Sequence, residues 1–209
     1  MQQITDELTE QYVYSLLPGR DAVLVEMEAE AQRRSIPIVG AVVGRFLYQL
    51  ARMIGAKRIF EMGSAIGYST VWLARAVGSD GKVYYCDASR TNADQAARYF
   101  ERAGVSAQVE ILVGDAIELL GAARGQFDLI FNDIDKSQYP QAFHTAVSRI
   151  RSGGLFVTDN VLWSGRVARD DREPATKAIR EFNRLIYASG QLYPVIVPMR
   201  DGLAICLKS

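Results

Sequence analysis

The spacing of hydrophobic positions divides the chain into a helical first part and a mixed second part. Through residue 54, apolar side chains recur three or four positions apart, which is typical of amphipathic helices. Pro18-Gly19 and Pro37 separate these segments. The recurring positions are Leu8, Tyr12 and Leu16, then Leu24, Met27 and Ala31, then Val42, Phe46, Leu50 and Ile54. We therefore expect helices before the first strand.

From Gly55 onward, short β-rich runs alternate with helical patterns. This alternation is typical of a parallel sheet covered by helices on both faces. Two late apolar runs flank the turn-like "RDG" and indicate a closing antiparallel hairpin. The predicted strands are residues 58–62, 82–87, 108–113, 127–133, 154–159, 193–197 and 203–207. We predict an α/β fold with a doubly wound, mostly parallel sheet preceded by N-terminal helices.

Length and charge narrow the class of protein. With 209 residues, 49% of them hydrophobic, the chain is long enough for one core and short for two. We expect a single domain, with helices in residues 1–54 that cover the site or a dimer interface and an α/β core in 55–209. The 24 basic and 24 acidic residues cancel, so no overall field attracts nucleic acid or a membrane.

The sequence shows neither a targeting signal nor a cysteine pattern typical of metal binding or disulfides. No apolar run approaches the roughly 18 to 20 residues of a membrane span, and the start "MQQITDELTEQY" is polar and acidic instead of basic and then apolar. We therefore expect a cytoplasmic protein. Cys86 and Cys206 lie in apolar runs without metal-type spacing, and we interpret both as reduced core thiols.

Acidic residues occur wherever a predicted parallel strand ends. In open α/β sheets, ligands bind at the carboxyl ends of the strands. Each of these ends carries a carboxylate or adjoins one: Glu61-Met62-Gly63, Asp87, Gly114-Asp115, Asp133 and Asp159-Asn160.

The first strand ends predict an adenosine pocket. In "RIFEMGSAIGYSTVWLARAV", Gly63 and Gly67 lie between a strand and a helix and allow close approach of a ligand. Asp87 ends the next strand, where a carboxylate can bind both ribose hydroxyls, and Asp115 lies at the third, near a purine edge. Alternatively, the glycines only form a turn and the two aspartates cap helices. Glu61, closing an apolar strand, requires a cationic or hydroxyl-bearing partner.

The fourth and fifth strand ends predict a metal site. The 26 residues from Asp133 to Asp159 allow a crossover helix over 138–149 and a neighbouring parallel strand. Asp133, Asp159 and Asn160 would then offer an all-oxygen set suited to Mg²⁺, or to Ca²⁺ or Mn²⁺. Lys136, three residues after Asp133, is a candidate base. The alternative is that the acids cap turns and Lys136 is a surface amine; Asp135 orients Lys136 or faces water.

Several motifs together resemble one family. "FEMGSAIGYSTVWLA", "DNVLWSGRV", "TKAIREFN" and "RDGLAICLK" look like class I, metal-dependent O-methyltransferases that use S-adenosylmethionine, the family of caffeoyl-CoA and catechol O-methyltransferases. The resemblance runs from about residue 44 to 208. The chain departs from the family in the apolar stretch 36–44 and at Ala65.

The resemblance implies a seven-stranded sheet with its last strand antiparallel, and a homodimer. It implies metal ligands at Asp133, Asp159 and Asn160, and Lys136 as the base. The implied cofactor residues are Glu61 and Gly63 near the methionine part, Ser69 at its carboxylate, Asp87 at the ribose, Asp115 and Ala116 at the adenine, and Asp133 beside them.

The leading hypothesis is therefore methyl transfer from S-adenosylmethionine to a hydroxyl of a catechol-like small molecule, with a divalent cation. A phenol has a pKa of about 10, and metal chelation with a nearby amine would ease its ionisation. A hydroxyuridine of tRNA is an alternative acceptor, met by a patch of Arg33, Arg34, Arg45 and Arg52. A non-catalytic S-adenosylmethionine-binding protein is a further alternative, whereas the glycine spacing disfavours a nicotinamide dehydrogenase.

Three residues near these motifs have open or structural roles. Trp163 and Arg166, in the long segment after Asn160, either contact an aromatic, acidic substrate or pin the loop to the body. His144, in the middle of a predicted helix, is interpreted as structural.

Overall fold

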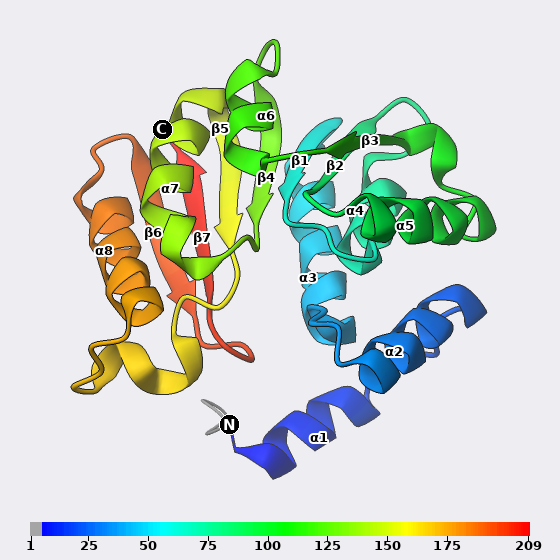
Figure 1. Cartoon of the computed structure of the whole chain (residues 1–209), viewed down its shortest axis with the longest axis horizontal. Coiled ribbons are helices and arrows are strands. Elements are labelled where there is room, and N and C mark those ends of the chain that lie inside the picture. Colours follow the sequence, from blue (N-terminus) through cyan, green and yellow to red (C-terminus); the bar gives the residue numbers. More distant parts are fainter. Residues whose placement is uncertain (1–5) are drawn as a thin grey trace.

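The computed structural model describes residues 6–209; Met1–Thr5, part of the polar start noted above, lie outside the described residues. One seven-stranded sheet runs through the molecule in the order β3-β2-β1-β4-β5-β7-β6 (Figure 1). β1 to β5 are parallel, and β7 is antiparallel to both β5 and β6. The strands are β1 Arg58–Met62, β2 Lys82–Asp87, β3 Val109–Val113, β4 Phe127–Asn132, β5 Ile150–Thr158, β6 Leu192–Val197 and β7 Leu203–Lys208. The predicted sheet and its closing hairpin are confirmed.

Helices precede the sheet and connect its strands. Three come before β1: α1 Glu7–Ser15, α2 Ala22–Arg34 and α3 Gly40–Met53. The others are α4 Tyr68–Val77, α5 Arg90–Arg102, α6 Ala116–Ala122, α7 Tyr139–Arg149 and α8 Pro174–Ala188. In residues 6–209, no helix is long and apolar enough to cross a membrane.

Two core clusters lie on opposite faces of the sheet. Along β1, Ile59 belongs to one cluster and Phe60 to the other, because successive side chains of a strand point to opposite faces. The first cluster is covered by α2, α3, α4 and α5, and the second by α6, α7 and α8. Both faces of the central strands are buried, which explains why those strands read as nearly continuous apolar runs. Cys86 and Cys206 are buried free thiols, as expected.

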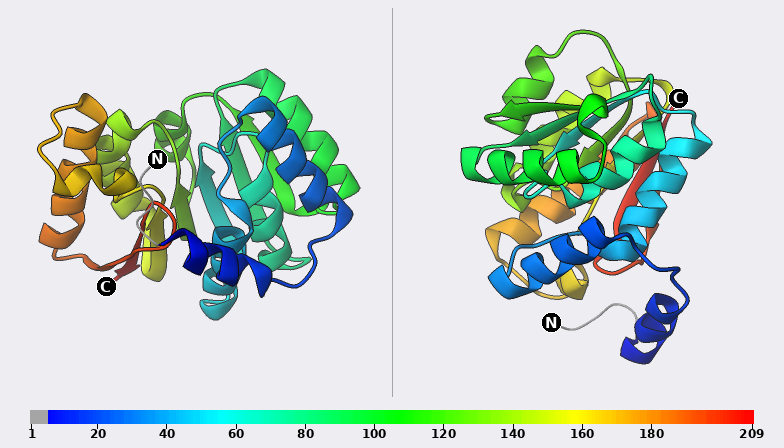
Figure 2. Two further views of the ribbon diagram at one scale, coloured as in Figure 1. Left: turned by 90° about the horizontal axis from the view of Figure 1, so that it is seen from below. Right: turned by 90° about the vertical axis from the view of Figure 1, so that its right-hand side faces the viewer.

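The N-terminal helices differ in how they pack. α2 buries Leu24, Met27 and Ala31 in the first cluster. α1 buries none of its residues, and its apolar positions Leu8 and Tyr12 are 74% and 63% exposed. Both views of Figure 2 show α1 at the outside of the molecule. The expected helices are therefore present, but the hydrophobic spacing of α1 does not reflect burial within this chain.

The register of the parallel strands places three functional positions side by side. Met62 pairs with Asn132 on β4, and Asn132 pairs with Thr158 on β5. The residues that follow are Gly63, Asp133 and Asp159. Strand β4 ends one residue earlier than predicted, so Asp133 begins the loop instead of closing the strand. Strand β5 begins at Ile150, four residues before the predicted start.

Candidate active site

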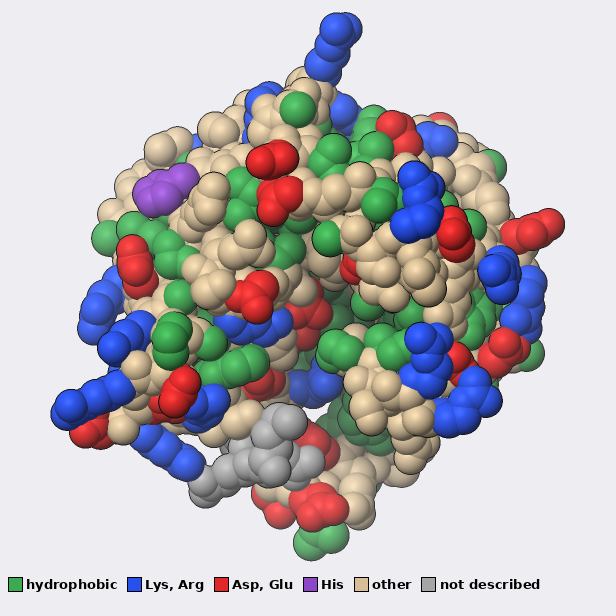
Figure 3. Space-filling view, viewed as in Figure 1, with side chains coloured by type: hydrophobic (Ala, Val, Ile, Leu, Met, Phe, Trp, Pro, Cys, Tyr) green, Lys and Arg blue, Asp and Glu red, His purple; other side chains and the backbone are tan. Residues whose placement is uncertain are grey.

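A cavity of about 580 Å³ lies at the carboxyl ends of β1 to β5. Figure 3 shows a hollow near the middle of this face, with acidic side chains along its wall. Most predicted site residues line the cavity: Gly63, Ser69, Asp87, Asp115, Ala116, Asp133, Lys136, Asp159 and Asn160. The candidate cofactor and metal residues therefore share one continuous space.

The turn between β1 and α4 brings backbone close to the cavity. Gly63 has a φ of +81°, and a Cβ there would lie 2.6 Å from the carbonyl oxygen of Asp133. The N–H groups of Gly63 and Ser64 both donate to the carbonyl oxygen of Cys86, at 3.1 and 2.9 Å. These bonds hold the turn against β2, and Ser69 follows in the first turn of α4. Only glycine combines this backbone conformation with this contact.

Asp87 and Asp115 combine structural bonds with a place in the cavity lining. Asp87 accepts hydrogen bonds from the N–H of Ala65 at 2.9 Å and the N–H of Ser89 at 2.8 Å. Asp115 caps α6 by accepting from the N–H groups of Ile117 and Glu118, both at 2.9 Å. The capping alternative thus describes Asp115 correctly without removing it from the cavity. A carboxylate has more acceptor sites than these bonds use.

Glu61 lies beneath the glycine turn and is fully buried. Its Oε2 accepts a hydrogen bond from the hydroxyl of Thr70, while its Oε1 has no partner. Burial raises the pKa of this carboxyl group to about 7, against the opposing effect of the Ser69, Thr70 and Ser64 hydroxyls. Glu61 does not appear in the cavity lining. It therefore supports the turn from below, and burial favours its uncharged form.

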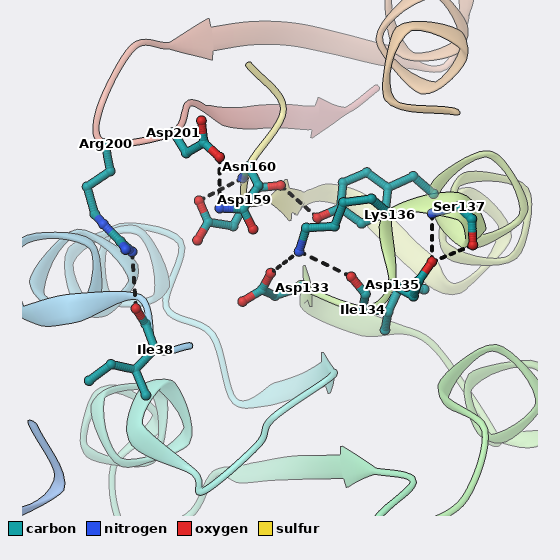
Figure 4. A network of polar contacts seen from close by, with 11 residues as sticks. Ile38, Asp133, Ile134, Asp135, Lys136, Ser137, Asp159, Asn160, Arg200 and Asp201 are labelled. Atoms are coloured by element: carbon teal, nitrogen blue, oxygen red, sulfur yellow. Dashed lines mark hydrogen bonds and ion pairs between the residues drawn. The ribbon is translucent and has the colours of Figure 1, made fainter. Parts of the chain in front are cut away.

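Across the cavity, two carboxylates and one amine face the same space (Figure 4). Lys136 Nζ lies 2.8 Å from Asp133 Oδ1 and donates to the carbonyl oxygen of Ile134 at 3.2 Å. Asp159 is 1% exposed, and its Oδ2 has no partner. The hydroxyl of Tyr139 supports the backbone here by donating to the carbonyl oxygen of Asp159 at 2.8 Å.

Burial and mutual repulsion destabilise the ionised forms of Asp133 and Asp159, and nearby positive charge opposes this effect. Burial and, to a lesser extent, repulsion by Asp133 together raise the pKa of Asp159 to about 7, against the attraction of Arg200. Burial also raises the pKa of Asp133, although the Lys136 ammonium opposes the shift. Close carboxylates in a water-poor site are expensive when both are ionised, and a cation between them reverses that cost.

Asn160 completes an oxygen-donor set. Its φ is +58°, and its Nδ2 lies 3.5 Å from Asp201 Oδ2, so its carbonyl oxygen points away from Asp201. Two acids and one amide match the preference of hard divalent cations for oxygen ligands. In the described residues, no three His, Cys, Asp or Glu side chains gather to hold a metal ion. The unpartnered Asp159 oxygen and the mutual repulsion of the two acids show that the residues present fit a divalent cation.

Arg200 is a site residue that the sequence interpretation missed. It lines the cavity from the β6–β7 turn, and its guanidinium donates to the carbonyl oxygens of Val39 at 2.5 Å and Ile38 at 3.3 Å. These bonds hold the segment before α3 over the cavity (Figure 4). The signal was present in "RDG", since a hairpin turn beside β5 lies at the same sheet edge as Asp159. From the sequence, these residues are interpreted as a turn and as part of a family motif, without a role for Arg200 in the site.

The structure also places Asp135, Trp163, Arg166 and His144, whose roles the sequence left open or structural. Asp135 accepts from the backbone N–H of Ser137 at 2.9 Å and so caps the short 3₁₀ turn that carries Lys136. Trp163 packs against the second core cluster, and Arg166 pairs with Asp171, which is the arrangement expected if they pin the loop. His144 is exposed on α7. None of these three outer residues, Trp163, Arg166 and His144, lines the cavity.

The fold and the site together define a class of protein. A parallel α/β sheet with a glycine turn after β1 and an acid at the end of β2 is built for a nucleoside-containing cofactor. The carboxylates of Asp133 and Asp159 lie beside it in the same cavity. Residues 20–209 match the O-methyltransferase family, and the chain belongs to it.

Relatives and solved structures agree with this assignment. The chain is 33% identical to a catechol O-methyltransferase of Niastella koreensis, across 96% of each chain. It is 32% identical to a caffeoyl-CoA O-methyltransferase of Petroselinum crispum, across 79% of this chain and 74% of that protein. It also resembles the O-methyltransferase TomG of Streptomyces achromogenes, solved in complex with SAM, with a TM-score of 0.88 and 30% identity across 97% and 96% of the two chains.

Proposed function

We propose that this protein transfers the methyl group of S-adenosylmethionine to a hydroxyl of a catechol-like small molecule, with a divalent cation bound at Asp133, Asp159 and Asn160. One observation carries the proposal: the glycine turn and the carboxylates line one cavity and meet where Gly63 contacts Asp133. The names of the similar catechol and caffeoyl-CoA enzymes support the acceptor class, and the SAM complex of TomG supports the cofactor.

The cofactor half of the cavity is formed by the ends of β1, β2 and β3. Asp87 is suited to accept hydrogen bonds from the ribose hydroxyls, and Asp115 with Ala116 borders the position of the adenine. Gly63, in the turn before α4, and Ser69, in the first turn of α4, are assigned to the amino-acid end of S-adenosylmethionine. Glu61 contributes to cofactor binding by supporting the glycine turn, since its own side chain is buried and does not line the cavity.

The acceptor half is formed by the ends of β4 and β5. A bound divalent cation would lower the pKa of a hydroxyl that coordinates it. Asp133, Asp159 and Asn160 orient the acceptor, so that one hydroxyl faces the cofactor half. Lys136 Nζ, 2.8 Å from Asp133 Oδ1, borders the same space and is assigned as the acceptor of that hydroxyl proton.

The chemistry then needs positioning more than a reactive side chain. The acceptor hydroxyl gives its proton to Lys136 Nζ in its neutral amine form, which becomes the ammonium, and the hydroxyl oxygen forms a bond to the methyl carbon as the carbon–sulfur bond breaks. The sulfonium leaves as a neutral thioether. Holding the oxygen in line with the methyl group and excluding water supply the rate enhancement. Arg200 contributes by fixing the Ile38 and Val39 segment over the cavity.

The test measures transfer of labelled methyl from S-adenosylmethionine to caffeic acid, with Mg²⁺ and with excess chelator. Transfer should need the metal, and Asp159→Ala should lower it at least about 100-fold, because a metal ligand is lost. Calorimetric binding of S-adenosylmethionine should change less than about threefold, because Asp159 lies in the acceptor half.

Asp170→Ala is the matched control, because Asp170 is an exposed acid that pairs with the exposed Arg172 at the surface. It should retain wild-type activity. Equal transfer with and without chelator would contradict the metal assignment. Cofactor binding without transfer to any catechol would contradict the acceptor class and leave the cofactor half standing.

A further inference from the structure

A second cavity, of about 270 Å³, lies next to the candidate active site. It is an open cavity bordered by α1, the start of α3 and the turn between β6 and β7. Six of its lining residues are apolar or aromatic: Val13, Tyr14, Val42, Val197, Pro198 and Met199. Thr9, Glu10 and Arg200 complete the lining. The proposed function uses none of these residues except Arg200.

Arg200 borders both cavities, and among the described residues it alone does so. On one side its charge acts on Asp133 and Asp159, and on the other it acts on the hydroxyl of Tyr14. A molecule with its hydroxyls at the carboxylates would reach the second cavity by passing the Arg200 side chain, which borders both spaces.

The size and lining of the second cavity suit one substituent of a ligand better than a complete ligand. Sites for complete drug-sized ligands span roughly 300 to 1,000 Å³, so a cavity of about 270 Å³ suits one substituent. Six of the nine lining residues are apolar or aromatic, so burial of a hydrocarbon group against them is favourable, whereas an ionised group would lose hydration along these walls. The occupant should be short, uncharged and apolar.

A second copy of the chain is a poorer occupant. The residues of α1 that line the cavity are Thr9, Glu10, Val13 and Tyr14. Leu8, Tyr12 and Leu16, which are 63 to 74% exposed, form a different stripe of the helix, at a spacing of four residues. A partner that covered this exposed stripe could therefore pack on α1 without filling the cavity.

We propose that the second cavity binds an uncharged apolar substituent of the acceptor, an alkyl or aryl group carried by the catechol-like ring. This inference rests on the proposed function, because the ring hydroxyls are placed at Asp133, Asp159 and Asn160. It makes the β6–β7 turn and α1 the elements that select among acceptors. Catechols with a short hydrocarbon group should be preferred over catechol itself.

The experiment compares catechol, 4-ethylcatechol and 4-butylcatechol. Their binding is measured by calorimetry with Mg²⁺ and S-adenosylhomocysteine present, and their kcat/KM values are measured separately. Each buried methylene is worth about a fourfold gain in affinity, so wild-type protein should bind 4-butylcatechol at least about tenfold more tightly than catechol.

Val13→Trp should fill the cavity and reduce this ratio to below about threefold. Val13 is 39% exposed, so the substitution leaves the core intact. Leu16→Trp is the matched control: it lies one helical turn later, outside the lining, and should keep the wild-type ratio. Val13→Asp should lower the ratio through charge instead of bulk, and Leu16→Asp should not.

Each outcome decides the proposal. Affinity that does not rise with chain length would overturn it, as would equal losses in Val13→Trp and Leu16→Trp. A change of oligomeric state in Val13→Trp, with no change in the ratio, would assign the cavity to an interface and overturn it too. If 4-butylcatechol binds through the cavity but no catechol is methylated, the subsite stands and the proposed reaction fails.

Discussion

Glu61 shows how a single residue links the cofactor turn to the stability of the fold. Its carboxyl group is fully buried, with one oxygen bonded to Thr70 and the other without a partner. Its pKa is raised to about 7, mainly by burial, from the ordinary value of 4.5. Between these two pH values the folded protein binds a proton that the unfolded chain releases. Stability therefore falls as pH rises through this window.

The first residue-scale prediction concerns Glu61→Gln in the metal-free protein. From pH 5 to pH 8, the wild-type free energy of unfolding should fall by about 2 to 3 kcal/mol more than that of the variant. Glutamine keeps the acceptor for Thr70 and cannot ionise. Urea denaturation at several pH values measures the difference. Asp159 also has a raised pKa but is present in both proteins, so its contribution cancels.

Glu181→Gln provides the matched control, because Glu181 is exposed on α8. Its pH profile should follow the wild type. Parallel profiles for Glu61→Gln and the wild type would mean that Glu61 is solvated or paired in solution, contrary to its buried and half-satisfied state.

At the scale of elements, the strands and the residues just after them could be predicted because each depends on local pattern. The alternation of apolar runs located β1 and β2 to the residue, and the rule that ligands bind at strand ends selected Asp87, Asp133 and Asp159. Arg200 and the Ile38 segment could not be found in this way. Their contact joins residues 161 and 162 positions apart, and no local spacing encodes it.

The element-scale prediction separates backbone strain from close approach in the glycine turn. Gly63 and Gly55 both have positive φ, of +81° and +60°. A Cβ at Gly55 would meet open space, whereas one at Gly63 would meet the backbone of Asp133. Gly55→Ala should therefore cost only the conformational strain, about 1 kcal/mol. Gly63→Ala should cost at least about 2 kcal/mol more, because β1 and β4 must shift apart.

The same shift should displace Asp133, so Gly63→Ala should weaken both Mg²⁺ and S-adenosylmethionine binding at least about tenfold. Denaturant titration measures the stability of both variants, and calorimetry measures binding. Gly55→Ala should bind both ligands as the wild type does. If the two variants lost equal stability and bound ligands equally well, the close contact between the turn and Asp133 would be refuted.

At the scale of the whole molecule, α2 packs into the core whereas α1 contacts the surface. Glu28 of α2 accepts a hydrogen bond from the hydroxyl of Tyr68 at 2.6 Å and pairs with Arg20 at 2.7 Å. Tyr68 itself lines the active-site cavity, so α2 connects directly to the site. α1 has no buried residue, although its spacing resembles that of α2. Periodicity identified both helices but could not tell which apolar stripe would be covered.

Two truncations test this difference. Removal of residues 1–18 should lower the free energy of unfolding by less than about 1 kcal/mol, because α1 buries no side chain. Removal of residues 1–35 should lower it by about 3 kcal/mol or more, because Leu24, Met27 and Ala31 leave the first core cluster. Circular dichroism during urea denaturation measures both. If the shorter truncation costs as much as the longer one, the exposed stripe of α1 must be covered in solution. A loss that grows with protein concentration would then identify a second copy of the chain as the cover, since only association makes stability depend on concentration.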